Sequence, residues 1–252
     1  MTALVSIGVA GAIGPETIAR IAPAVEAAGF HALWVNDTPH GDALAGLAAA
    51  ARVTATLTLA TGVVPVDRRP AAEIVRAARH LPHDRLVLGI GSGTARSGAL
   101  ARVRDAVADL REHTSAQVLV GALGPKMRAL AARDADGPLL SWLTPAAARV
   151  QAAEAHRESA RAHVALYVRA AIDPAATPRL EEETERYAGY PNYAANFARL
   201  GIEAADTVLA PTRFSAGLHD YRDAVDEVVL RAIVPGDDAA DYTAFIEQAA
   251  GA

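Results

Sequence analysis

A glycine–proline turn near the middle of the chain is the first stretch whose residue types indicate chemistry. Gly124 and Pro125 follow the apolar run 117–121, and they suit the N-cap and the first position of a helix. A helix that begins directly after a buried strand presents free N–H groups and its positive dipole end to an anion. Lys126 is a cation in that first turn, where it opposes the helix dipole, and a bound phosphate would balance it. The turn alone fits a phosphate site and a plain strand–helix turn with a solvated lysine equally well.

A carboxylate at a strand end is the second candidate. Asp37 follows the apolar run 32–36 and is accompanied by Thr38 and His40. A carboxylate in such a place can take up or release a proton during catalysis. A helix cap or turn acid explains Asp37 equally well, and a surface-loop histidine is the simpler reading of His40.

Several common motifs are incomplete. The segment 89–93, Gly-Ile-Gly-Ser-Gly, lacks the third glycine of a dinucleotide fingerprint, and no Walker lysine follows it. The eight histidines form no metal pair of the metalloprotease kind, so we expect no metal. The absence of cysteine excludes disulfides, cysteine-ligated clusters and thiol catalysis.

Composition narrows the class of protein further. The formal net charge is −5 without a long basic run, which argues against a nucleic-acid partner. The N-terminus has no basic region before its apolar residues, so it does not read as a signal peptide. The longest charge-free apolar runs are shorter than the roughly 18 residues of a membrane helix. We therefore expect a cytoplasmic protein, away from membranes; a homodimer is one alternative for its assembly.

Apolar runs and helical periodicity alternate along the whole chain. The expected helices separate these runs, and the region 201–227 reads as a mixture of helix and loop. Eight such units in 252 residues predict one (β/α)8 TIM barrel over residues 1–252, with a doubly wound open sheet as the alternative. The expected strands are 5–9, 32–36, 54–60, 86–90, 117–121, 137–142, 164–168 and 228–233.

The barrel hypothesis places the site at the carboxyl ends of the strands. Small residues gather there, at Gly62-Val63 after the third strand and at Gly91-Ser92-Gly93 after the fourth. Such glycines let the backbone approach a flat or phosphorylated ligand closely. Ser141 and Trp142 end the sixth strand, and Arg169 follows the seventh.

Five segments together resemble the luciferase-like flavin oxidoreductases, and within them the branch that uses the deazaflavin F420. The resemblance follows the family's order over about the first 145 residues and thins after Thr144. The most specific stretch is 121–127, Gly-Ala-Leu-Gly-Pro-Lys-Met. The full set of segments is 26–37, 61–65, 88–93, 121–127 and 135–140.

The resemblance implies a compact barrel with shortened insertions and a flavin-type ring across its mouth. It implies a non-prolyl cis peptide behind the ring at Gly62-Val63, and a cofactor phosphate on the turn 122–124 and the helix that follows it. Ser92 would help from the fourth strand. The cofactor residues that it assigns are Gly62, Val63, Gly91, Ser92, Ala122, Leu123, Gly124, Pro125 and Lys126.

Asp37 matches the acid that F420 members place near the reactive ring, and it is the expected catalytic residue. Thr38 stands where many of those members have histidine, so the resemblance leaves open whether Thr38 or His40 takes part. Trp142 and Tyr190 are expected to wall the substrate pocket, together with the neighbouring aromatic residues 187, 193 and 197. Their helical spacing equally suits a place in the core.

Three functions follow from the resemblance. The first is F420-dependent hydride transfer to or from a small organic substrate. The second is an FMN-dependent monooxygenase, which would need to shield a reactive intermediate from water and which a shortened lid disfavours. The third is a flavin-binding protein without turnover.

Overall fold

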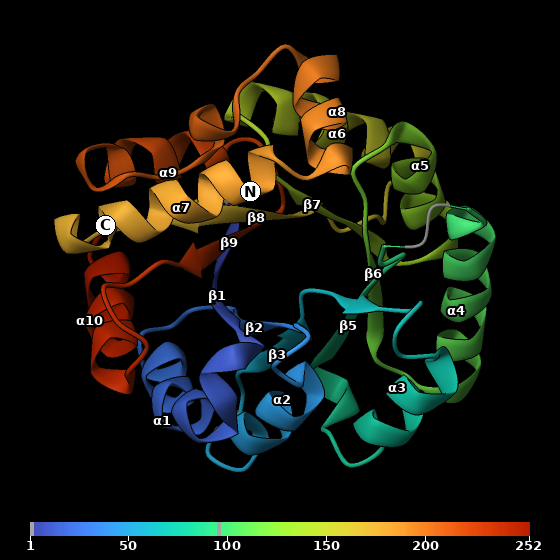
Figure 1. Cartoon of the computed structure of the whole chain (residues 1–252). Coiled ribbons are helices and arrows are strands. Elements are labelled where there is room, and N and C mark those ends of the chain that lie inside the picture. The colour runs from blue at the N-terminus through green and yellow to red at the C-terminus, as the bar shows by residue number, and fades with distance from the viewer. Residues whose placement is uncertain (1–2, 95–96) are drawn as a thin grey trace.

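The computed structural model describes residues 3–94 and 97–252 and shows strands arranged in a ring with helices around it (Figure 1). Met1 and Thr2, with which the N-terminal run begins, lie outside the described residues, as do 95 and 96. The strands are β1 Leu4–Ala10, β2 Ala32–Asn36, β3 Thr58–Thr61, β4 Val64–Pro65, β5 Leu86–Gly91, β6 Gln117–Gly121, β7 Gly137–Ser141, β8 Ala165–Ala170 and β9 Glu227–Ala232.

The sheet closes on itself, and all its strand pairs are parallel. The strand order is β3-β2-β1-β9-β8-β7-β6-β5-β4, and a further pairing of β3 with β5 joins the two ends. β4 continues β3 beyond Gly62-Val63, so β3 and β4 together count as one of the eight strands of the barrel. The predicted (β/α)8 barrel is confirmed, and the open-sheet alternative is wrong because β3 and β5 are hydrogen-bonded.

The helices lie outside the ring and begin where the sequence supplies caps. Asp42, Thr144 and Asp238 each accept an N–H from the first turn of the helix that follows them. Within residues 3–94 and 97–252, no helix is long and apolar enough to cross a membrane. The helices are α1 Gly14–Ala27, α2 Ala43–Ala51, α3 Ala71–Ala78, α4 Ala99–His113, α5 Pro125–Asp134, α6 Pro145–Glu158, α7 Thr177–Ala188, α8 Pro191–Leu200, α9 Phe214–Arg222 and α10 Ala239–Ala250.

Alternation along the strands produces two cores. On β2, Leu33 and Val35 face the helices, whereas Trp34 points into the barrel. Inside, side chains from seven strands fill the centre, so the barrel is a packed core rather than a pore. That interior cluster is Ala32, Trp34, Ala60, Val87, Leu119, Leu139, Ala165, Tyr167 and Val229.

The third strand is shorter than its sequence predicts. It begins at Thr58 rather than Thr54, because the backbone N–H groups of 55–57 donate to one carboxylate oxygen of Glu26, at 2.6 to 2.9 Å. Arg85 donates to the carbonyl oxygens of Thr54 and Leu57 on the same stretch. Backbone groups bonded to side chains in this way are not free for a strand ladder.

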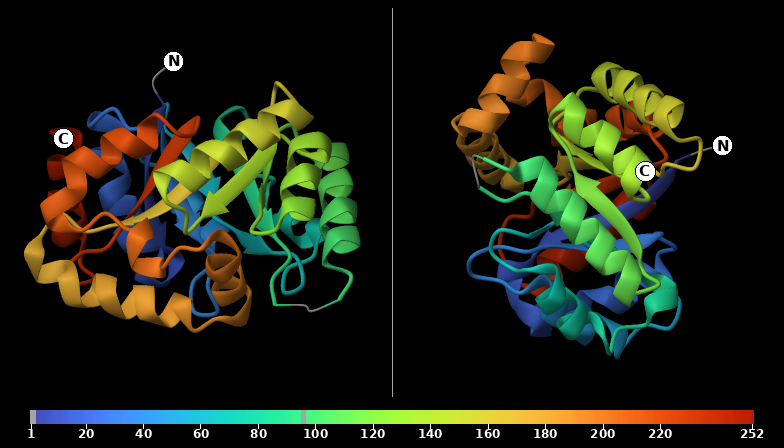
Figure 2. Two further views of the ribbon diagram at one scale, coloured as in Figure 1. Left: turned by 90° about the horizontal axis from the view of Figure 1, so that it is seen from above. Right: turned by 90° about the vertical axis from the view of Figure 1, so that its right-hand side faces the viewer.

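The segment between β8 and residue 200 adds two helices at one end of the barrel, and the region 201–227, expected to be mixed, forms two short 3₁₀ helices and α9. After β8 the chain forms α7 and α8 before it reaches α9. Both views of Figure 2 show α7 and α8 beyond one end of the barrel. The carboxyl ends of the strands lie at this end, since side chains from α7 and α8 share a cavity with them.

A polar cluster lies at the other end of the barrel. Glu227, at the start of β9, accepts hydrogen bonds from Ser6 (2.6 Å) and Trp34 (2.7 Å), and one oxygen lies 2.8 Å from His163 Nε2. Burial works to raise the pKa of Glu227, but these partners outweigh it and hold the pKa below its usual range. One carboxylate and one histidine therefore balance each other here.

Candidate functional site

A cavity of about 900 Å³ opens at the carboxyl ends of the strands. Each of the eight barrel strands contributes to the lining of the cavity, and α7 and α8 complete the lining on one side. Its volume lies in the range of small-molecule and cofactor sites. It occupies the face of the barrel at which the active sites of this architecture occur.

One side of the cavity, which we call the glycine wall, consists of residues 62–63, 91–93 and 121–124. It contains no charged residue. The Gly62–Val63 peptide is cis, as the resemblance implies. A Cβ atom on Gly91 or Gly121 would lie 2.7 or 3.1 Å from the Val63 side chain, so both glycines make room for Val63. The wall presents backbone and uncharged side chains to a ligand, namely Val63, Ser92, Ala122 and Leu123.

The turn between β6 and α5 ends the glycine wall. α5 begins at Pro125 with Gly124 as its N-cap, and no side chain caps it. The Leu123 carbonyl oxygen accepts hydrogen bonds from Arg128 and Arg199, each at 3.0 Å. Arg199 comes from α8 and lines the cavity. An uncapped helix N-terminus beside a guanidinium suits a phosphate.

Pro125 and Lys126 face elsewhere. They line a second hollow of about 560 Å³ among residues of α4, α5 and α6, and neither is among the described residues that line the large cavity. Met127, the next residue of α5, does line it. The backbone of the turn, rather than the Lys126 side chain, therefore faces the cavity.

Asp37 lies at the cavity with both oxygens engaged. One accepts the N–H of Ala43, the first residue of α2, at 3.0 Å, and the other pairs with Arg68. The Asp37 side chain is only 5 % exposed, whereas Arg68 is 40 % exposed. Thr38 and His40 also line the cavity. The helix-cap and functional readings of Asp37 are thus compatible.

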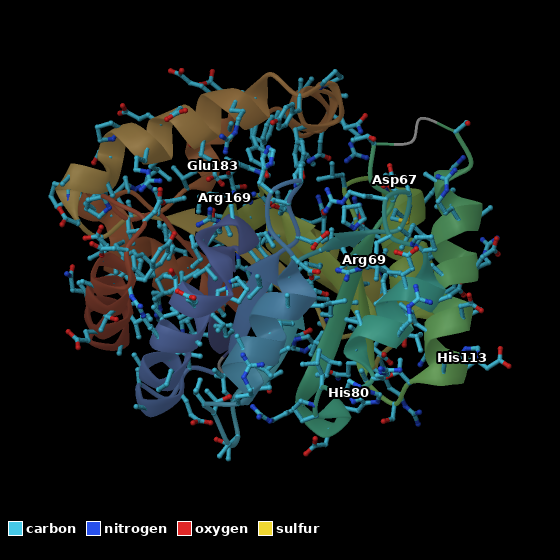
Figure 3. The ribbon with its side chains drawn as sticks, turned by 60° about the horizontal axis from the view of Figure 1, so that its bottom comes forward. Asp67, Arg69, His80, His113, Arg169 and Glu183 are labelled. Carbon is cyan, nitrogen blue, oxygen red and sulfur yellow. The ribbon has the colours of Figure 1, made fainter. Side chains whose placement is uncertain are left out.

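Opposite the glycine wall lies a cluster that we call the arginine wall: Arg169 of β8, Arg231 of β9, and Glu183 and Arg186 of α7. Arg169 Nε donates to Glu183 at 3.1 Å, and another nitrogen donates to Ser141 at 2.6 Å. Figure 3 shows Arg169 beside Glu183, with His80 and His113 drawn well away from both. Arg231 and Arg186 lie 3.6 and 3.7 Å from the other Glu183 oxygen.

The guanidinium groups decide the charge of Glu183. Burial works to raise its pKa, but the nearby charges of Arg231 and Arg169 outweigh burial and hold the pKa below its usual range. Glu183 is therefore ionised at neutral pH.

Aromatic rings hold Arg169 in place. Its guanidinium carbon lies 4.2 Å from the centre of the Trp142 ring and 4.7 Å from that of Tyr187. Trp142 has a φ of 58°, which ends β7 at Ser141 and turns the chain after it. A positive φ is uncommon for so bulky a residue.

The structure separates the predicted substrate residues from the cavity surface. Trp142 is 1 % exposed and lies behind Arg169, while Tyr190 is 45 % exposed at the start of α8; neither is among the described lining residues. Tyr187 and Tyr193 do line the cavity, and Phe197 is buried against Trp142. The aromatic group is therefore part core and part wall.

Comparison with known proteins agrees with this geometry. Residues 3–98 match the family model described as luciferase-like monooxygenase. The structure resembles an F420-dependent secondary alcohol dehydrogenase in complex with an F420-acetone adduct, with 14 % identity, 99 % of each chain covered and a TM-score of 0.75. This chain has the luciferase-like fold.

Two further solved structures resemble the luciferase-like barrel. One is the coenzyme F420 dependent tetrahydromethanopterin reductase from Methanopyrus kandleri, with 16 % identity, coverage of 99 % of this chain and 97 % of that chain, and a TM-score of 0.75. The other is EDTA monooxygenase from Chelativorans sp. BNC1, with 11 % identity, coverage of 100 % and 93 %, and a TM-score of 0.72. No curated protein matches the chain by sequence.

Several residues that line the cavity of the luciferase-like barrel were not predicted from the sequence. They are Glu183, Arg186, Asn196, Arg199 and Arg231. A signal for part of them exists, because an arginine interrupts each of the last two apolar strands near its carboxyl end, at 169 and 231. The residues on α7 and α8 carry no comparable signal, since their place depends on how those helices lie.

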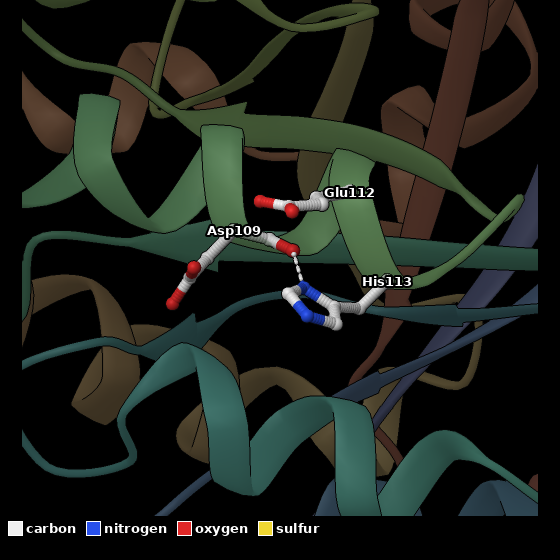
Figure 4. A group of neighbouring side chains, drawn as sticks. All are labelled: Asp109, Glu112 and His113. Atoms are coloured by element: carbon white, nitrogen blue, oxygen red, sulfur yellow. Dashed lines mark hydrogen bonds between the residues drawn. The ribbon is translucent and has the colours of Figure 1, made fainter.

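One exposed group outside the cavity has metal-ligand character. Asp109, Glu112 and His113 lie within one turn of α4, and their ligand atoms lie within 4.8 Å of one another (Figure 4). His113 Nδ1 lies 2.8 Å from the Asp109 carbonyl oxygen, which engages one of its two ring nitrogens. Exposed acidic groups of this kind are common on helices, and we assign the trio no function.

Proposed function

We propose that the luciferase-like barrel is an F420-dependent oxidoreductase that transfers hydride to or from a small organic substrate. The observation that carries this proposal is the uncharged glycine wall, which forms one face of a 900 Å³ cavity and ends at the uncapped N-terminus of α5. A flat ring needs such a close-approach surface, and its phosphate needs such a helix end.

The residues present fit a cofactor of this kind. Val63 would contact the ring from the centre of the glycine wall, since Gly91 and Gly121 leave space only for its side chain. The backbone of the β6–α5 turn and Arg199 would hold the phosphate. A Cβ atom on Gly124 would meet no protein atom within 4 Å, so the turn is open on that side.

When bound, F420 supplies the carbon that gives or accepts the hydride, and the protein supplies position and electrostatics. Asp37 would hold the proton coupled to this transfer. Arg68 is half-exposed, so its side chain can move away from Asp37. The other Asp37 oxygen stays bound to the N–H of Ala43, so α2 keeps its first turn. His40 lines the cavity near Asp37 and would link it to solvent.

Support for F420 over FMN comes from the two F420 proteins with TM-scores of 0.75. The family model's description as a monooxygenase favours FMN, which makes FMN the second candidate. Parallel titrations of the purified protein with F420 and FMN, followed by cofactor fluorescence, compare the two. We expect saturable F420 binding that is tighter than FMN binding. Tight FMN binding with no detectable F420 binding would contradict the proposal.

The substitution Asp37→Asn tests turnover against binding alone. Asp42→Asn is a matched control, because Asp42 also accepts an N–H at the start of α2 and pairs with an arginine, Arg69, but does not line the cavity among the described residues. We expect Asp37→Asn to lower hydride transfer with reduced F420 while F420 binding persists. Equal rates in both variants would remove Asp37 from proton handling, and binding without turnover of any substrate would favour a flavin-binding protein.

A further inference from the structure

We propose that the substrate carries a carboxylate or phosphate group that binds to the arginine wall. This inference rests on the proposed function, because it assigns a ligand to the part of the same cavity that the cofactor leaves free. It follows from charge, from the donors that remain unused, and from the way the other charges around the cavity are balanced.

The charge of the arginine wall is out of balance. Three guanidinium groups surround the one carboxylate of Glu183, so the cluster has an excess of two positive charges. Arg169 takes the direct contact with Glu183, so the excess falls on Arg231 and Arg186; Arg231 is only 13 % exposed, and a cation without full compensation is costly there. An anionic group entering the cavity would compensate that charge.

Two of the three arginines keep donors available. Arg169 directs hydrogen bonds to Glu183 and Ser141, and its stacked position makes it the fixed member. Arg231 and Arg186 lie 3.6 and 3.7 Å from Glu183, well beyond the roughly 2.8 Å of a charge-assisted hydrogen bond. They attract Glu183 without committing an N–H to it, and a guanidinium fork matches a carboxylate or phosphate.

The other charged groups that line the cavity have partners or another role. Asp37 is neutralised by Arg68, so it does not offset the arginine excess. Arg199 donates to the Leu123 carbonyl oxygen at the β6–α5 turn, where the cofactor phosphate is expected. The glycine wall has no charge to offer. An anion on the ligand is thus the partner that the arginine wall lacks.

Malonate, and its uncharged counterpart malonamide, are the probes for this site. Calorimetric titration of the F420-saturated protein should show saturable malonate binding and at least about tenfold weaker malonamide binding, as loss of a charged hydrogen-bonding partner implies. Arg186→Gln should weaken malonate binding by about tenfold for the same reason. Arg133→Gln is the control: Arg133 is 53 % exposed and pairs with a glutamate, as the 52 % exposed Arg186 does, but it lines the other hollow.

The same titration without cofactor identifies the source of the anion. Equal malonate affinity with and without F420 supports a substrate group, whereas competition between malonate and F420 would mean that the cofactor itself occupies the arginine wall and would overturn the inference. Absence of malonate binding while F420 still binds would overturn the inference and leave the proposed function standing. Malonate binding without any F420 binding would support the anion site and contradict the proposed cofactor.

Discussion

The two walls of the cavity are built in opposite ways. The glycine wall is formed by strand ends that follow one another in the chain, carries no charge, and consists of backbone and uncharged side chains, Val63 among them. The arginine wall joins β8 and β9 to α7 outside the barrel, and it consists of side chains of opposite charge that lie close together. The first suits a flat ring of fixed shape, and the second suits a charged group.

This difference indicates a division of labour within one barrel. A backbone surface changes little when nearby side chains change, so it can hold a common cofactor. The arginine wall also includes exposed side chains of α7, such as Arg186, that can change without disturbing the strands, so this part of the wall can select a substrate. We expect substitutions in the two walls to have separable effects.

The largest expected effect comes from removing the fixed member of the arginine wall. Arg169→Leu leaves Glu183 buried with more distant partners, and breaking a buried ion pair in this way lowers the free energy of unfolding by about 3–5 kcal/mol. Urea denaturation measures the loss. The double variant Arg169→Leu with Glu183→Leu should recover part of it; no recovery would mean that stacking on Trp142, rather than charge, holds this wall together.

Crowding the glycine wall should have the next largest effect. In Gly91→Ala the new Cβ atom would lie 2.7 Å from the Val63 side chain, and overpacking of this kind costs about 1–3 kcal/mol. Combining it with Val63→Ala removes the clash, so thermal denaturation of the double variant should show less than the sum of the single losses. Additive losses would show that Val63 does not fill the space next to Gly91.

The sequence predicts the glycine wall better than the arginine wall for a physical reason. Buried parallel strands read as near-continuous apolar runs, so seven of the eight expected strands lie within two residues of the observed bounds, and the third starts late. The position of the cis peptide came from the resemblance at Gly62-Val63. These features depend on neighbours in the chain.

The arginine wall depends on contacts between distant parts of the chain. Glu183 is 14 residues from Arg169, and nothing in the periodicity of α7 shows that it crosses the barrel mouth. Lys126 was expected at the phosphate because of its place in the sequence, yet its side chain lines the outer hollow. Whether the Lys126 side chain reaches the cavity depends on the direction in which it leaves the axis of α5, and a turn motif does not specify that direction.

The cluster around Glu227 and His163, at the end of the barrel away from the cavity, has balanced charges and serves as a reference for the arginine wall. Burial works to lower the pKa of His163, but the hydrogen bond and charge of Glu227 outweigh it and raise the pKa above its usual value of about 6.5. The charged histidine therefore stabilises the fold below that value, and this contribution is lost as pH rises through the raised pKa. His163→Gln should lose about 1 kcal/mol at pH 6 and less at pH 9 in urea denaturation. An equal loss at both pH values would indicate that the contact stabilises the fold through packing alone.

The smallest expected effect on stability belongs to Arg186→Gln. Arg186 is half-exposed and lies 3.7 Å from Glu183, so its loss should change the free energy of unfolding by less than about 0.5 kcal/mol. Thermal denaturation beside the Arg133→Gln control measures this change. A loss as large as that of Arg169→Leu would make Arg186 part of the structural frame rather than an available donor.

The dissociation constant of F420 in the wild type, Gly91→Ala and Arg186→Gln tests the division of labour most directly. Fluorescence titration should show F420 binding that Gly91→Ala weakens by about tenfold or more, because Val63 is forced toward the ring, and that Arg186→Gln leaves unchanged. The opposite order, with F420 affinity lost in Arg186→Gln and kept in Gly91→Ala, would contradict the account.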